Sequence, residues 1–235
     1  MTIGSSTLLR KVYRADEADP SNLLGSTVAA VTASQDATGF KLASAGAGTG
    51  HYHLGDKLFY NVDRLVRAEF LFKASNMTTS AQSIELGLIT AYNADLSLTA
   101  SRVILKTVAA AVNGKYLFEA FSDDGTTVVN NESTGFYLTP GKLYRASFGF
   151  KSGSQTVSFP GNSKPGKSSV QIAISDDAAS TSHSFSRKTP LMQRTAHLDL
   201  SDYSGGLQPV IGFVSTGASP TLEVKEICID YLQET

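Results

Sequence analysis

The stretch Val66-Arg-Ala-Glu-Phe-Leu-Phe-Lys73 alternates between apolar and polar side chains and places Val66, Ala68, Phe70 and Phe72 on one side. A period of two residues is typical of a β-strand with one apolar face. The same period recurs around Leu86 and Phe148, and almost nothing in the chain has the helical period. Because a sheet with one apolar face must bury that face, the pattern predicts an all-β fold, an antiparallel β-sandwich.

Turn residues divide the region after residue 65 into short strands at the spacing of a sandwich. Asn113-Gly114 predicts a tight hairpin that begins a three-stranded meander. In the last strand the apolar side chains change parity between Val224 and Ile227, which predicts a β-bulge near residues 225–226. The predicted strands are residues 65–74, 82–90, 101–109, 115–122, 126–130, 142–151, 168–175, 208–214 and 221–232.

The beginning of the chain differs in composition from the rest. Residues 25–50 consist mostly of Ala, Ser, Thr and Gly, so no long core element fits there. We therefore predict an extended N-terminal arm over residues 1–50, with short strands, and a sandwich domain over residues 51–235. The arm is either a loose leader or a strand donor that pairs with the sheet edge of a neighbouring subunit. The polar stretch 176–203 is predicted as a long irregular loop.

Charge and cysteine content exclude several classes of function. The chain has 20 Lys and Arg against 21 Asp and Glu, without a basic cluster among aromatics, so no nucleic acid is expected as a partner. Cys228 is the only cysteine, which rules out an intramolecular disulfide and predicts a buried, inert thiol. The sequence shows neither a secretory signal nor about 20 consecutive apolar residues, so neither that export route nor a membrane span is expected.

No motif typical of catalysis or metal binding is complete. A glycosidase needs two acids close together, and Glu85 and Glu119 each stand alone in a strand. His51 and His53 lie on one side of an extended segment and supply half of a zinc or nickel site, without a second pair of ligands. We expect no catalytic residues, no metal and no cofactor.

Several aromatic residues lie in or beside predicted loops. An aromatic side chain there can pack on the core, stack on a sugar ring or anchor a protein interface. We expect interface or ligand contacts from this group, and the candidates are Tyr92, Tyr137, Phe185 and Tyr203.

Two stretches of the sandwich region have a likeness to a known family. They are Ile84-Glu-Leu-Gly-Leu-Ile89, and Leu207-Gln-Pro-Val-Ile-Gly-Phe213 leading to Leu222-Glu-Val-Lys-Glu-Ile-Cys-Ile-Asp-Tyr231. Both resemble the concanavalin A-like jelly rolls of lectins, laminin-G modules and many tailed-phage virion proteins. In that layout the first stretch is an inner-sheet strand, the Gln-Pro stretch is the penultimate strand, and the final stretch is the last strand, beside the first.

Within that group the chain is more similar to head decoration or cement proteins of phages than to secreted lectins. The sequence shows no signal peptide, disulfide or Trp, and an Ala/Ser/Thr-rich N-terminal arm is expected before the jelly roll. The resemblance implies a non-enzymatic virion protein, made in the host cytoplasm and placed on the capsid surface. Its partners would be the major capsid protein or another virion protein, and it would form a homo-oligomer such as a trimer. The alternative is a carbohydrate-binding or host-receptor-binding module that uses loop aromatics to bind a glycan.

Overall fold

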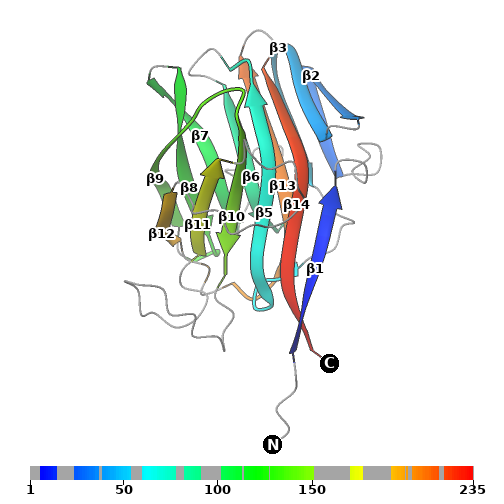
Figure 1. The fold of residues 1–235 in the computed structure, drawn as a ribbon, viewed down its shortest axis with the longest axis vertical. Coiled ribbons are helices and arrows are strands. Elements are labelled where there is room, and N and C mark those ends of the chain that lie inside the picture. The colour runs from blue at the N-terminus through cyan, green and yellow to red at the C-terminus, as the bar shows by residue number, and fades with distance from the viewer. Residues whose placement is uncertain are drawn as a thin grey trace, which may run out of the picture.

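The computed structural model is a β protein (Figure 1). It describes residues 6–14, 24–36, 39–53, 60–77, 82–90, 102–112, 114–126, 128–150, 170–176, 192–198, 200, 203–216 and 220–234. Within these ranges, no helix is long and apolar enough to cross a membrane. The strands are β1 (Ser6–Arg14), β2 (Leu24–Asp36), β3 (Gly39–His53), β4 (Tyr60–Asn61), β5 (Leu65–Ser75), β6 (Ser83–Ile89), β7 (Arg102–Val112), β8 (Lys115–Asp123), β9 (Val128–Leu138), β10 (Leu143–Gly149), β11 (Val170–Asp176), β12 (Met192–Leu198), β13 (Gly206–Thr216) and β14 (Thr221–Glu234).

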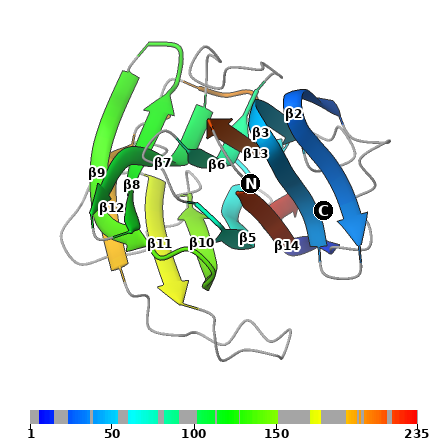
Figure 2. The ribbon, with the colours of Figure 1, turned by 90° about the horizontal axis from the view of Figure 1, so that it is seen from above.

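The strands form one antiparallel sheet that curls round on itself (Figure 2). The strand order is β12-β11-β10-β5-β14-β3-β13-β6-β7-β8-β9, while β1 pairs with β14, β2 with β3 and β4 with β13. Strand β3 belongs to both parts of the sheet, because residues 40–43 pair with β14 and residues 47–53 pair with β13. We call the strands from β12 to β14, together with β1, the β14 half, and the strands from β13 to β9 the β13 half.

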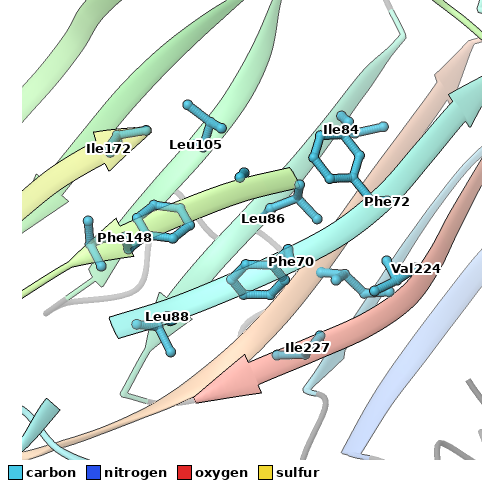
Figure 3. Packing of buried hydrophobic residues seen from close by; sticks show 14 of the residues in the cluster. Phe70, Phe72, Ile84, Leu86, Leu88, Leu105, Phe148, Ile172, Val224 and Ile227 are labelled. Atoms are coloured by element: carbon cyan, nitrogen blue, oxygen red, sulfur yellow. The ribbon is translucent and has the colours of Figure 1, made fainter. Parts of the chain in front are cut away.

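The apolar faces of the two halves pack against each other and form the core (Figure 3). The rings of Phe72 in β5 and Phe118 in β8 lie 6.2 Å apart across this interface. Beside them, Phe70 in β5 contacts Phe148 in the neighbouring β10 with ring centroids 5.9 Å apart. Each fully buried side chain of this kind contributes about 2 kcal/mol of stability. The predicted antiparallel β-sandwich is therefore confirmed.

Residues 24–53 are not the extended arm that their composition predicts. They form the long strands β2 and β3, and β3 lies in the middle of the sheet between β14 and β13. Phe40 and Leu42 of β3 are fully buried in the core. The prediction of an arm over residues 1–50 is wrong here, because a strand paired on both sides needs few large side chains of its own: backbone hydrogen bonds to its neighbours hold it in place.

Every strand predicted after residue 65 is present, and β9 runs further than predicted. The bulge is confirmed, because the register between β14 and β5 shifts between Val224 and Glu226. Val112 pairs with Lys115, as the predicted hairpin requires. The prediction of an irregular loop over residues 176–203 is wrong for β12, a polar strand that pairs with β11. The last strand does lie beside the first, since β14 pairs with β1.

Candidate functional site

A row of polar residues crosses the outer face of the β13 half, on the side of the sheet opposite the core. Register aligns His51 of β3 with Gly212 of β13, Gly212 with Glu85 of β6, Glu85 with Lys106 of β7, and Lys106 with Glu119 of β8. Residues aligned across neighbouring strands point their side chains to the same face. We call this set the His51–Glu119 row.

Glu85 is the centre of the row. Its Oε1 lies 2.6 Å from Nζ of Lys106, and its Oε2 lies 3.5 Å from Nε2 of His51. His51 and Glu85 are buried, although they lie on the outer face. They reach each other across an intervening strand because Gly212 has no side chain: a Cβ there would lie 2.6 Å from Cδ2 of His51 and 3.0 Å from Oε2 of Glu85.

The electrostatic surroundings keep Glu85 ionised. Burial alone would raise the pKa of this carboxyl, but the neighbouring His51 and Lys106 outweigh the burial and hold the pKa below its usual value. Oε2 of Glu85 has no hydrogen-bond partner among the described residues. The sequence indicated that Glu85 and Glu119 each stand alone, whereas the fold places both in one row with Lys106 between them.

Tyr137 lies next to this row on the edge strand β9. Its side chain is 39% exposed. Leu117 of β8 is directly opposite Tyr137, and beyond a register shift between these two strands Glu119 is opposite Ser133. The side chain of Leu117 is half-buried on the outer face, between neighbours whose side chains enter the core. We call Tyr137, Leu117, Glu119 and Ser133 the Tyr137 face. It combines an exposed ring with hydroxyl and carboxylate oxygens.

Of the other predicted site residues, only Tyr203 lies within the described structure, and its side chain has a structural role. The hydroxyl of Tyr203 donates a 2.8 Å hydrogen bond to the carbonyl oxygen of Gly206, and its ring packs on the core. Burial raises the pKa of Tyr203, in keeping with this structural role. Tyr92 and Phe185 lie outside the described residues.

A second polar set lies on the outer face of the β14 half, and Asp230 of β14 is its most strongly bonded member. Arg10 of β1 donates two hydrogen bonds to the Asp230 carboxylate, from Nε at 2.6 Å and from Nη2 at 2.8 Å. Arg67 of β5 donates two more, at 2.9 and 3.2 Å. Burial would raise the pKa of Asp230, but these hydrogen bonds outweigh it and leave the pKa below its usual value.

The same set continues from Arg67 to Glu69 and on to Arg145 of β10. Glu69 lies 3.2 Å from Arg67 and 3.8 Å from Arg145, which in turn lies 3.7 Å from Glu226. For Glu69 the effect of burial is larger than the effect of the neighbouring arginines, so the pKa of Glu69 is raised. We call Arg10, Asp230, Arg67, Glu69, Arg145 and Glu226 the ion network.

The histidine and cysteine predictions have separate outcomes. His51 contacts Glu85, while the side chain of His53 lies outside the described residues. Among the described side chains, no three of the His, Cys, Asp and Glu type group together as metal ligands would. Cys228 of β14 is buried beside the ion network, and burial raises the pKa of its thiol to about 12. The prediction that this thiol is buried is therefore confirmed, and its raised pKa disfavours the reactive thiolate.

Comparisons with known proteins show a fold shared with carbohydrate-binding proteins. No family model and no curated protein matches the chain. The solved structure of lectin UEA-II complexed with galactose matches with a TM-score of 0.59 and 10% identity over 94% of this chain and 98% of that chain. The Lotus tetragonolobus seed lectin matches with a TM-score of 0.57 and 10% identity over 98% of this chain and 100% of the lectin. The transglycosylase Crh5 in complex with NAG matches with a TM-score of 0.54 and 13% identity over 94% and 83% of the two chains.

At these identities the likeness shows the fold and nothing finer. The similar structures include both lectins and carbohydrate-active enzymes, so they do not separate binding from catalysis. These likenesses give no support to a virion role. The chain has the concanavalin A-like lectin fold, built as a curled, all-β antiparallel sheet.

Proposed function

We propose that the chain is a non-enzymatic carbohydrate-binding module and that the Tyr137 face is its binding surface. The observation that carries this proposal is the exposed ring of Tyr137 on β9, the strand whose Ser133 is opposite Glu119 of β8. A sugar ring has an apolar face of C–H groups, which stacks on an aromatic ring, and hydroxyls at its rim, which bind carboxylate and hydroxyl oxygens. The Tyr137 face offers both kinds of contact within two neighbouring strands.

The charge state of the His51–Glu119 row supports binding rather than hydrolysis. A glycosidase needs one acid whose pKa is raised, so that it can donate a proton to the leaving group, and a second acid across the scissile bond. The pKa of Glu85 is lowered, and Lys106 lies between Glu85 and Glu119 in the row. A carboxylate that is already paired with an ammonium group is a poor proton donor.

The test is a glycan array probed with the wild-type chain and three variants. We expect Tyr137→Ala to abolish binding and Tyr137→Phe to retain most of it, because stacking needs the ring and not the hydroxyl. Val128→Ala is the matched control, since Val128 is also exposed on β9 but has no aromatic ring. Binding by the wild-type chain that survives Tyr137→Ala would place the glycan elsewhere, and no binding to any glycan would reject the function.

The virion role stays a prediction, as do the capsid partner, the trimer and the capsid location. The described feature best suited to a protein contact is β1, on which Leu8 is 57% exposed. Cosedimentation of the purified chain with phage particles of a candidate source would test it. Saturable binding that Tyr137→Ala leaves intact would favour the virion role over glycan binding.

A further inference from the structure

Strand β1 is attached to the molecule through a single neighbour. It pairs with β14 over its whole length, from Ser6 opposite Glu234 to Arg14 opposite Glu226, and among the described strands it pairs with no other. In Figure 1 it runs beside β14 at the margin of the sheet. None of its described side chains belongs to the buried core, and Leu8 is 57% exposed. Removing β1 would therefore open no cavity in the core.

The position that β1 occupies on β14 would stay organised without it. When Arg10 leaves with β1, Asp230 keeps its hydrogen bonds from Arg67, so this buried carboxylate still has a charged partner. The core side chains of β14, among them Ile227 and Ile229, belong to the interface with the β13 half and do not depend on β1. Apart from the two hydrogen bonds from Arg10, β1 supplies the backbone pairing of a strand edge that would otherwise be open, and such an edge is a site for another strand.

The charges of β14 favour one kind of strand at the edge that β1 occupies. Arg10 lies opposite Asp230 and donates two hydrogen bonds to it, so the register aligns a basic residue of β1 with an acidic residue of β14. Two β1 strands side by side would instead bring like charges together, which disfavours direct pairing between the free edges of two molecules. The strand that matches the edge of β14 in register and charge is β1 itself, from the same chain or from a second copy.

We propose that β1 exchanges between two copies of this chain, so that each copy places its β1 against β14 of the other. The exchanged contacts are identical to the internal ones, so the exchange loses no hydrogen bond and no ion pair, and it makes a dimer. Residues 15–23 connect β1 to β2, and an extended segment of this length can span about 30 Å, which allows the strand to reach a neighbouring molecule. The proposal is independent of the glycan site.

A disulfide between two differently marked chains tests the exchange. Val12 of β1 lies directly opposite Cys228 of β14, and Cys228 is the only cysteine of the chain. The first chain has Val12→Cys with Cys228→Ser, and the second is the wild type with a mass tag. Each chain has one thiol, so neither can cross-link within itself at this site. After mixing and mild oxidation, exchange predicts a disulfide-linked heterodimer, detected on a non-reducing gel and by mass spectrometry.

Two controls make the result decisive. Leu8→Cys with Cys228→Ser carries a more exposed thiol that is out of register with Cys228, so it reports random collision. Val12→Cys alone has both thiols in one chain, and a disulfide there, either within one chain or between two exchanged chains, shows that β1 docks in the described register. A heterodimer with the Val12→Cys chain and none with the Leu8→Cys chain supports exchange. Three outcomes would overturn exchange. They are a disulfide that forms only within single Val12→Cys chains, equal cross-linking of the Val12→Cys and Leu8→Cys chains to the wild type, and no disulfide in any sample.

Discussion

The two halves of the sheet both place buried acids on their outer faces, and they satisfy those acids differently. In the ion network, Asp230 receives four hydrogen bonds from two arginines, whereas Glu69 has ion-pair contacts at 3.2 and 3.8 Å. In the His51–Glu119 row, Glu85 has one close ammonium group and a histidine at 3.5 Å. The pKa falls for Asp230 and Glu85 and rises for Glu69. All three acids are buried, so the number and closeness of their cationic partners decide whether the pKa is lowered or raised.

The largest effect is expected at Asp230. Asp230→Ala removes the carboxylate that joins β1, β14 and β5 and leaves two arginines without their shared partner. Breaking a buried ion pair from one side typically costs 3–5 kcal/mol, and because both arginines are partly exposed we expect about 3 kcal/mol. Urea unfolding of the variant and of the wild type measures the difference. A loss no larger than that of Glu69→Ala would show that the two acids are equivalent and that the comparison is wrong.

The next effect concerns the glycine that allows Glu85 and His51 to meet. Gly212→Ala adds a Cβ that lies too close to both side chains, so we expect a loss of about 2 kcal/mol in the free energy of unfolding. Gly141→Ala is the control, because it has open space around its Cβ and a positive φ of 86°. It should lose about 1 kcal/mol through backbone strain alone. Equal losses would mean that crowding at Gly212 has no role.

A smaller effect is expected for Glu85→Gln, about 1 kcal/mol at neutral pH. Because the pKa of Glu85 in the folded state is below its ordinary value of 4.5, ionised Glu85 stabilises the fold above that pH. This stability is lost as the pH falls through the folded-state pKa. Unfolding measured from neutral pH down to about pH 3 should therefore show the wild type and the variant converging.

Glu69→Gln should change the free energy of unfolding least, and it should raise this free energy whereas the other substitutions lower it. The pKa of Glu69 is raised in the folded state, so ionised Glu69 is unfavourable and the neutral amide should stabilise the protein by less than about 1 kcal/mol at neutral pH. As the pH falls through the folded-state pKa towards 4.5, the wild type takes up a proton and the gain disappears. Chemical unfolding near neutral pH and near pH 4.5 checks this; a loss of stability at neutral pH would contradict it.

The sequence predicted well what depends on alternation within a strand. The apolar face of β5, the bulge in β14 and the hairpin after Val112 all follow from residues close together in the chain. It failed for β3 and β12, whose side chains are small or polar. These strands form because of the neighbours that pair with them, and those neighbours lie far away in the sequence.

The candidate site was predicted only in part for the same reason. Tyr137 was identified as an aromatic beside a loop, which is a local signal. The His51–Glu119 row was missed, because its members come from five strands and only the register of those strands aligns them. The isolated His51, Glu85 and Lys106 each give no sign of the others. A signal did exist in Gly212, a glycine within an apolar strand, which often marks a close approach of neighbouring groups.

The place of β14 also affects how the chain folds as it is synthesised. β14 follows every other described strand, yet it lies between β5 on one side and β3 with β1 on the other. Until its residues leave the ribosome, the edges of β3 and β5 have no strand between them and the β14 half cannot close. The emerging chain therefore exposes apolar strands until β14 has been synthesised, and closure of the β14 half has to wait for that strand.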